Sequence, residues 1–391
     1  MVLQAHSLHH QPGQRLVFID ALRVAAIVFV IVHHAAQAYG PTGGFWPVHD
    51  RAQSDWFAPF YTANAAFGMG LMFLLAGYFV PPAHDRKGAR RFLRERGLRI
   101  GIPLASFVLL LHLPLAYVLE GMPAPLQFLG HLYERGWQPI YLHFWFVAHL
   151  LLYCLAYVAL RQFLGWFEVA PRSVPPVGHG GIVAFVLVLA LITWLVRIRY
   201  PVDRWVPFLW IMSAEPAHLP QYMALFAVGI VAYRGDWFRR MSIADGLVWL
   251  AIGVSASAGI YLAYAFGWWK MAPGGPGLES LMRSGWETVI AVGLSIGLIV
   301  AFRELFDRSS RLLELMAAAS FGAYILHPAI VVALQASITD ISLTAFAKFA
   351  AVSLLGIVAA FAVAHVAGRV PGVRAILGSS AGREASLASA A

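Results

Sequence analysis

The chain has 391 residues, of which 60% are hydrophobic and 12% are charged, and its formal net charge is +9. Soluble domains usually carry about 25% charged residues, so an ordinary soluble enzyme is excluded. Apolar runs extend along almost the whole length, which indicates a single polytopic membrane domain in a lipid bilayer. In such a protein Lys and Arg act mainly as orientation signals, so we expect no nucleic-acid partner.

Apolar stretches of about 20 residues predict an all-α integral membrane fold, a bundle of about ten transmembrane helices. The span at 219–233 is short and opens with Pro220, so it is the weakest prediction, and losing it would reverse the topology of everything after it. Residues 1–17 are predicted to be a polar tail, 18–368 the transmembrane domain and 369–391 a disordered tail. The predicted spans are 18–39, 61–80, 102–119, 140–160, 182–198, 219–233, 244–267, 286–302, 312–336 and 344–367.

The distribution of positive charge predicts the orientation of these spans. With the N-terminus inside, the inner segments hold nineteen Lys and Arg residues and the outer segments seven. Cytoplasmic loops are enriched in positive charge, so both termini are predicted to be cytoplasmic. The connections 40–60, 120–139, 199–218 and 268–285 then lie outside, and their Trp, Tyr, Pro and Gly residues give the outer face material for a pocket.

Cysteine and histidine usage argues against a metal centre. The single cysteine, Cys154, lies in an apolar run, so neither an intrachain disulfide nor a Cys/His metal cluster is expected. His6, His9 and His10 belong to the polar N-terminal tail, which we interpret as unstructured. No metal site is predicted.

The first predicted helix, FIDALRVAAIVFVIVHHAAQAYG, carries Asp20, Arg23, His33 and His34, although ionisable groups are costly in a bilayer. Arg23 and His34 are eleven residues apart, which places them within roughly 20° of one helix face and about 16 Å apart. Asp20 can pair with Arg23 at i,i+3, whereas His33 points about 100° away from His34. This face suits a bound polar ligand or a buried catalytic base, and a structural ion pair with a core histidine is the alternative.

Three further groups could carry chemistry. Arg96 and Arg99 share a helix face before the third span and suit phosphate oxygens, although they also fit a simple orientation signal. Trp145 and Tyr324 suit interface anchors. His143 and His327 need polar partners if they are buried.

Six pieces of the sequence, in chain order, are FIDALRVAAIVFVIVHH, GLMFLLAGYFV, RGLRIGIP, HFWFVAHLLLY, LPQYMALFAVGIVAYRGDWF and FGAYILHPAI. With these pieces in this order, the chain resembles acyltransferase family 3 of polytopic membrane proteins over roughly residues 15–367. Arg23 and His34 have the family's Arg-x10-His spacing, and Arg96 and Arg99 match its Arg-x-x-Arg element.

The resemblance implies a membrane O-acyltransferase with acyl-CoA as donor substrate and no bound cofactor. Members move an acyl group, commonly acetyl and sometimes succinyl, from cytoplasmic acyl-CoA to a hydroxyl of an extracytoplasmic acceptor, often a glycan. Composition rich in Ala, Gly and Arg fits a multi-pass protein of a bacterial inner membrane. The sequence identifies neither the acceptor, nor the acyl group, nor the oligomeric state.

The resemblance also implies residue roles. His34 matches the essential histidine, Arg23 the motif arginine with Asp20 as its partner, and Arg96 and Arg99 would contact the CoA phosphates. His143, Trp145, Tyr324 and His327 are candidates for binding the acceptor or orienting His34.

Several alternatives stay open. His33 could replace His34, Arg91 and Arg94 share the spacing of Arg96 and Arg99, and an acyl-histidine intermediate competes with direct transfer. A transporter of a polar metabolite is the rival class, and a scaffold is a third.

Overall fold

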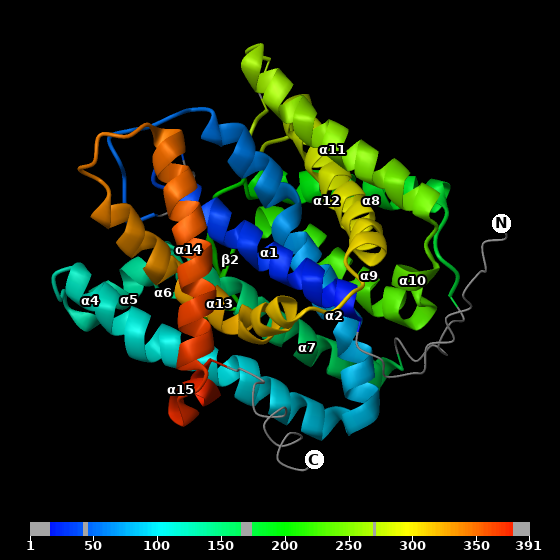
Figure 1. Cartoon of the computed structure of the whole chain (residues 1–391), viewed down its shortest axis with the longest axis horizontal. Coiled ribbons are helices and arrows are strands. Elements are labelled where there is room, and N and C mark those ends of the chain that lie inside the picture. Colours follow the sequence, from blue (N-terminus) through cyan, green and yellow to red (C-terminus); the bar gives the residue numbers. More distant parts are fainter. Residues whose placement is uncertain (1–15, 42–45, 166–173, 269–270, 378–391) are drawn as a thin grey trace.

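The computed structural model describes residues 16–41, 46–165, 174–268 and 271–377, and these are almost entirely helical (Figure 1). The sheet they contain is one antiparallel hairpin, in which β1 (Val206–Phe208) pairs with β2 (Met212–Ala214). Eight described helices are long and apolar enough to cross a membrane. The predicted all-α integral membrane fold is therefore confirmed.

Each of the ten predicted spans coincides with a helical segment. The number differs from eight because 61–80 and 102–119 lie in one helical run, Phe57–Leu119, and because α9 has only 17 residues. Residues 1–15 and 378–391 of the predicted tails lie outside the described residues, whereas 371–376 of the predicted disordered tail form a short helix. The long helices are α1 (Val17–Ala36), α2 (Phe57–Arg96), α7 (Trp145–Leu164), α8 (His179–Arg199), α9 (Leu219–Gly235), α11 (Ile243–Ala265), α12 (Leu278–Leu305), α13 (Arg311–Ser337) and α14 (Ala345–Ala367).

Short helices connect these elements. They are α3 (Ile102–Ala105), α4 (Leu113–Leu119), α5 (Pro125–Glu134), α6 (Gln138–Tyr141), α10 (Trp237–Arg240) and α15 (Pro371–Ile376), with the 3-10 turns η3 (Leu142–Phe144) and η4 (Pro216–His218). Several long helices begin at a side-chain cap: Ser242, Ser310 and Thr344 accept hydrogen bonds from the backbone N–H three residues later. Such caps satisfy N–H groups that have no partner within the helix.

The helical run Phe57–Leu119 changes direction and pitch where the sequence requires it. Gly88 has φ +71°, a left-handed conformation that favours glycine, and it breaks α2 between its apolar and its Arg-rich part. Two π-helical segments follow, η1 (Gly97–Gly101) and η2 (Ser106–His112), each placed just before a proline. Proline lacks an N–H and its ring clashes with the preceding turn, which favours such wide turns.

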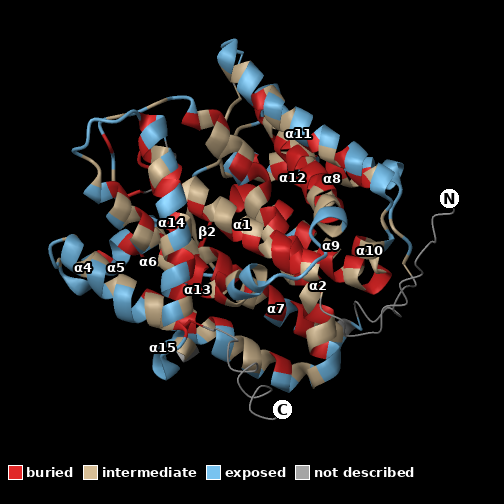
Figure 2. Ribbon diagram, in the orientation of Figure 1, coloured by how far each residue is buried: buried red, intermediate tan, exposed pale blue. Residues whose placement is uncertain are grey.

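Helix α1 lies at the centre of the bundle and packs against α2, α12, α13 and α14 (Figures 1 and 2). Close packing elsewhere depends on glycine. A Cβ atom at Gly77 of α2 would lie 2.1 Å from the Phe226 carbonyl oxygen, and one at Gly229 of α9 would lie 2.2 Å from that of Leu74. Small residues let membrane helices approach closely, so α2 and α9 meet backbone to backbone.

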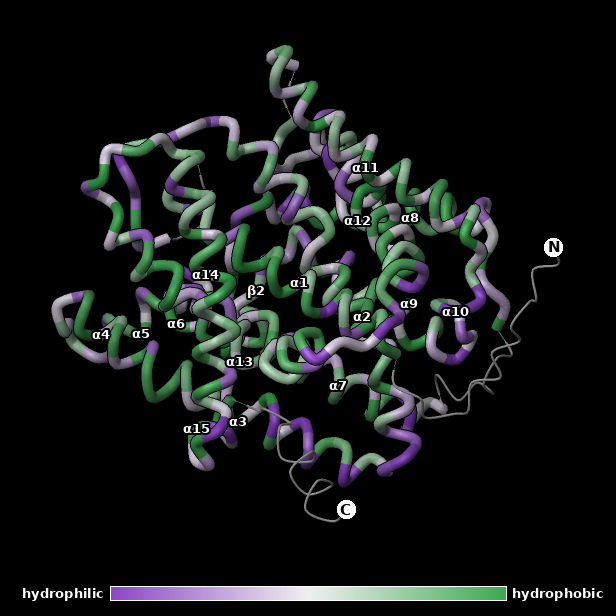
Figure 3. Tube along the Cα trace, viewed as in Figure 1, coloured by the Kyte–Doolittle hydropathy of each residue, from purple (hydrophilic) through white to green (hydrophobic). Residues whose placement is uncertain are grey.

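The outer helices carry exposed apolar faces. Figure 2 shows α11 and α14 with long exposed stretches, and Figure 3 shows that α8 and α11 are largely hydrophobic. Leu187 of α8 is 65% exposed and Val358 of α14 is 61% exposed. Faces of this kind are stable against lipid, which agrees with a multi-pass membrane protein.

Candidate active site

The central feature of the site is a pair of histidines from two neighbouring helices. His34 lies in the last turn of α1, and His327 lies one residue before Pro328 in α13. His34 Nδ1 is 2.8 Å from His327 Nε2, and His327 Nδ1 is 2.6 Å from the Tyr324 carbonyl oxygen. The relay Tyr324–His327–His34 joins residues about 300 positions apart in the chain.

The direction of these hydrogen bonds follows from their last acceptor. A carbonyl oxygen only accepts, so His327 Nδ1 donates to Tyr324. Neutral imidazole then accepts at Nε2, and His34 Nδ1 must donate to it. His34 Nε2 is left with its lone pair, and no described residue forms a hydrogen bond with this atom. The relay therefore presents a neutral imidazole nitrogen as a proton acceptor.

A tryptophan holds the other face of His34. The Trp46 ring stacks on the imidazole with centroids 5.1 Å apart and planes 7° apart. Trp46 Nε1 donates to Gln335 Oε1 over 2.7 Å, and Gln335 Nε2 donates to the carbonyl oxygens of His34 and Ala35. The stack and these bonds fix the orientation of the end of α1 and of its imidazole.

A cavity of about 850 Å³ lies beside His34, and it is bounded by the ends of helices and by the predicted outer loops. His33 and His34 line it, together with Asn64 and Tyr61 of α2 and Trp46. His34 thus sits near the predicted outer end of the bundle and not at its middle, because α1 ends two residues later at Ala36.

Of the four residues predicted to bind the acceptor or orient His34, three line the cavity and one contacts His34. His143, Trp145 and Tyr324 line the cavity, and the His143 ring centroid lies 5.5 Å from that of His327. Tyr324 also donates a 2.5 Å hydrogen bond to the His143 carbonyl oxygen. His327 contacts His34 directly, which suits the orienting role.

His33, the alternative to His34, lines the same cavity. Its Nε2 is 3.0 Å from Gln37 Nε2, an amide nitrogen that can only donate. His33 Nε2 is therefore occupied as an acceptor, whereas Nδ1 is buried without a partner among the described residues. This arrangement favours His34, whose open Nε2 is an acceptor, as the base.

Asp20 and Arg23 lie at the opposite end of α1. Arg23 Nη2 is 2.9 Å from Asp20 Oδ1 and 3.3 Å from the Ala317 carbonyl oxygen of α13. Neither residue lines the His34 cavity. The predicted ion pair is present, and it leaves Arg23 about 16 Å along the helix from His34.

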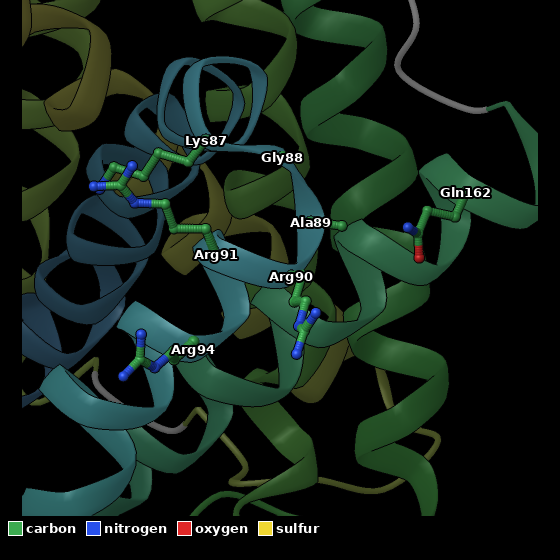
Figure 4. Close-up of a pocket in the computed structure, with 7 residues that line it drawn as sticks. All are labelled: Lys87, Gly88, Ala89, Arg90, Arg91, Arg94 and Gln162. Atoms are coloured by element: carbon green, nitrogen blue, oxygen red, sulfur yellow. The ribbon is translucent and has the colours of Figure 1, made fainter.

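The arginine-rich end of α2 forms a second cavity, of about 690 Å³ (Figure 4). Its lining comes from α2 and α7 and includes Lys87, Arg90, Arg91, Arg94 and Gln162. The alternative pair Arg91 and Arg94 therefore lies in this cavity.

Arg96 and Arg99 are the pair that matches the family's Arg-x-x-Arg element. They lie within two helical turns after Arg94 and do not line this second cavity. The Arg96 guanidinium lies 5.1 Å from the Phe92 ring centroid, and the Arg99 side chain is exposed. Figure 3 shows this part of the run as hydrophilic, on the predicted inner side.

Two groups of ionised side chains were not identified from the sequence. On the predicted inner side, Asp85 binds Arg161 of α7 and Arg234 of α9, the latter at 2.6 Å. On the predicted outer side, Glu287 of α12 lies 2.5 Å from Arg197 Nη2 and 2.8 Å from Arg283 Nε. A carboxylate within an apolar span was the signal that could have singled out Glu287.

His218 completes the outer group. Its Nδ1 lies 3.0 Å from Glu215, and its Nε2 lies 3.7 Å from Glu287. Burial opposes the charged form, but the two carboxylates outweigh burial and raise the pKa of His218 to about 9. Burial likewise opposes ionisation of Glu215, yet His218 lowers the pKa of this carboxyl. Desolvation of the carboxyl by the surrounding protein and the charge of Glu215 raise the pKa of Asp203.

No set of three or more His, Cys, Asp or Glu side chains within the described ranges is arranged to hold a metal ion. The site is instead a histidine relay beside a large outer cavity, with a basic cavity at the opposite end of α2. Lys87 and Asn64 are 23 residues apart, about 35 Å along a straight helix, which is close to the thickness of a bilayer core. This geometry is that of a multi-pass membrane protein with one cavity near each end of α2.

A family model described as "Acyltransferase domain" matches residues 16–366, so the chain belongs to acyltransferase family 3. This confirms the resemblance drawn from the six sequence pieces. No solved structure matches the chain.

Curated relatives carry the name "Glucans biosynthesis protein C". The protein of Salmonella schwarzengrund is 29% identical over 223 residues, 56% of this chain and 55% of the relative. That of Salmonella paratyphi B is 28% identical over the same shares. That of Salmonella paratyphi A is 28% identical over 171 residues, 42% of this chain and 43% of the relative. The chain therefore matches about half the length of these relatives.

Proposed function

We propose that the protein is an integral membrane O-acyltransferase that moves an acyl group from cytoplasmic acyl-CoA to a hydroxyl of an extracytoplasmic glycan. Family membership supports acyl transfer, and the relatives' name supports a glucan as acceptor. The organisms of the relatives support a bacterial inner membrane. The observation that carries the proposal is the open Nε2 of His34 beside the outer cavity.

The chemical step follows from the hydrogen-bond relay. An acceptor hydroxyl approaches His34 Nε2, which takes its proton while the hydroxyl oxygen attacks the thioester carbonyl carbon. The new C–O bond forms, the C–S bond breaks, and the imidazolium returns the proton to the CoA thiolate. His327 and the Tyr324 carbonyl stabilise the positive charge that His34 carries between these two events.

The donor is proposed to enter from the inner side. Arg96 and Arg99 bind the CoA phosphates in this proposal, and the neighbouring cavity with Arg91 and Arg94 supplies further guanidinium groups. The pantetheine arm then passes Arg23 toward His34. Acyl-CoA is a consumed substrate here and no bound cofactor takes part.

An acetyl group is the acyl group we favour. A succinyl carboxylate would require a cation near the thioester carbon. Among the described residues that line the outer cavity, the cationic side chains are Arg283 and His218, and the carboxylates of Glu287 and Glu215 balance their charges. The side chains that contact the His34 ring are those of His33, Trp46 and His327, and none of them is a Lys or Arg.

The test is release of free CoA thiol by the detergent-solubilised protein, with acetyl-CoA or succinyl-CoA and a panel of glycans. We expect release that requires a glycan, is faster with acetyl-CoA and is lost in His34→Ala. His131→Ala is the matched control, because His131 is exposed on α5 and lines neither cavity. Full transfer by a properly inserted His34→Ala protein would overturn the proposal, and flux of a metabolite without thioester consumption would favour a transporter.

A further inference from the structure

The far wall of the outer cavity contains polar groups that the acyl-transfer step does not use. Asp203, Glu215, His218 and Arg283 line the same cavity as His34, and they come from the loop after α8, from the segment around η4 and from α12. Arg197 and Glu287 support them from behind at 1% and 4% exposure. The sequence places these residues far apart, and the fold collects them at one end of the cavity.

The ionic contacts in this wall balance its charge. Glu287 binds both Arg197 and Arg283, and Glu215 binds His218. With His218 protonated, three cations face the carboxylates of Glu215, Glu287 and Asp203. A wall without net charge gives no preference to a charged ligand, so its polar groups suit a neutral one.

Two groups of the wall and one amide elsewhere in the same cavity have hydrogen-bonding atoms to spare. Among the described residues, Arg283 contacts Glu287 through Nε, and its two terminal nitrogens have no hydrogen-bond partner there. No described residue forms a hydrogen bond or an ion pair with the Asp203 carboxylate; its backbone N–H donates to Glu215 instead. Asn64 is 6% exposed and lines the cavity, yet its Nδ2 has no partner among the described residues. A buried amide without a partner is costly unless a ligand satisfies it.

Aromatic rings line the same cavity and adjoin this wall. Trp145 stacks on Tyr222 with centroids 5.4 Å apart and meets Trp205 edge to face at 5.9 Å, and all three line the cavity. Tyr222 in turn stacks on His218 at 5.9 Å. Broad apolar faces beside separate donors and acceptors match the C–H faces and hydroxyls of a sugar ring.

We propose that Asp203, Arg283, Asn64 and the Trp145–Trp205 pair form a subsite for one neutral sugar unit of the acceptor, which presents a hydroxyl to His34. The subsite rests on the proposed glycan acyltransferase function and specifies its acceptor as an uncharged, polyhydroxylated chain. Asp203 accepts from sugar hydroxyls, Arg283 and Asn64 donate to sugar oxygens, and the indole rings cover the apolar face of the sugar.

The experiment measures binding and turnover separately, with neutral gluco-oligosaccharides as the probe. Binding to the full-length protein is followed by tryptophan fluorescence, and transfer by release of CoA thiol from acetyl-CoA. The variants are Asp203→Asn and Trp205→Ala, with Trp205→Phe as the conservative version. Asp340→Asn is the matched control, because Asp340 is exposed in a predicted outer turn and does not line the cavity.

We expect Asp203→Asn and Trp205→Ala to raise the acceptor KM about tenfold and to leave the KM for acyl-CoA within twofold. Trp205→Phe and Asp340→Asn should keep the acceptor KM of the native protein. Transfer with an unchanged acceptor KM in Asp203→Asn and Trp205→Ala would overturn the subsite while the function stands. Oligosaccharide binding that these variants weaken, without any acyl transfer, would overturn the function and support the subsite.

Discussion

His34 and His218 line the same cavity, but their partners give them opposite roles. His34 is bonded to another imidazole, and no described carboxylate contacts either ring of that relay. His218 lies between Glu215 and Glu287, which hold its proton. A histidine whose partner accepts one hydrogen bond keeps a lone pair for chemistry, whereas a histidine between carboxylates becomes a fixed cation. These contacts distinguish His34, the proposed base, from His218, which belongs to the charged wall of the proposed sugar subsite.

The largest effect should come from removing the base. His34→Gln is expected to lower kcat by about 10²–10⁴-fold, the usual contribution of general base catalysis, with acyl-CoA binding unchanged. His218→Gln should keep kcat within tenfold and raise the acceptor KM instead. The measurement is steady-state CoA release together with equilibrium binding of acyl-CoA, and an equal loss of kcat in both variants would erase the distinction between the two histidines.

Breaking the buried ion pairs should lower the free energy of unfolding more than breaking the His34–His327 hydrogen bond. Glu287→Ala leaves the buried Arg197 without its carboxylate partner, which costs about 3–5 kcal/mol in comparable sites. Unfolding by SDS in mixed micelles measures the change. Glu279→Ala, in the exposed first turn of α12, is the control and should change the free energy of unfolding by less than about 0.5 kcal/mol.

The raised pKa of His218 predicts how stability depends on pH. A group whose pKa is higher in the folded state stabilises the fold below its unfolded value of 6.5, and this contribution is lost as the pH rises through 9. The shift is worth on the order of 3 kcal/mol. The midpoint of SDS unfolding should therefore decrease as the pH is raised from 6.5 to 9, and the decrease should be smaller in His218→Gln. A midpoint that falls equally in both proteins would rule out His218 as its cause.

The smallest effect concerns the orientation of His34. His327→Phe removes the acceptor for His34 Nδ1 and should reduce kcat about tenfold, the cost of one hydrogen bond of about 1.4 kcal/mol. His327→Gln can accept through its amide oxygen and should restore most of the rate. Both variants should keep the acceptor KM, so a raised KM without a change in kcat would assign His327 to acceptor binding.

What the sequence could predict was local or motif-based. The apolar runs predicted the ten long helical segments but not the short helices α5 and α15, and the i,i+3 spacing predicted the Asp20–Arg23 pair. Both His34 and His327 were predicted as candidates from the sequence. Their hydrogen bond was not predicted, because the two residues are 293 positions apart in the chain. The wall around Glu287 was missed because its partners come from three separate elements.

Hydrogen-bond direction in the relay is the central claim, and nitrogen NMR of ¹⁵N-histidine-labelled protein tests it most directly. The His34 signals are assigned by their loss in His34→Gln. We predict that at neutral pH His34 carries its proton on Nδ1 and has an unprotonated Nε2, which shifts when a glycan binds. A His34 ring protonated at Nε2, or at both nitrogens, would contradict its role as the base.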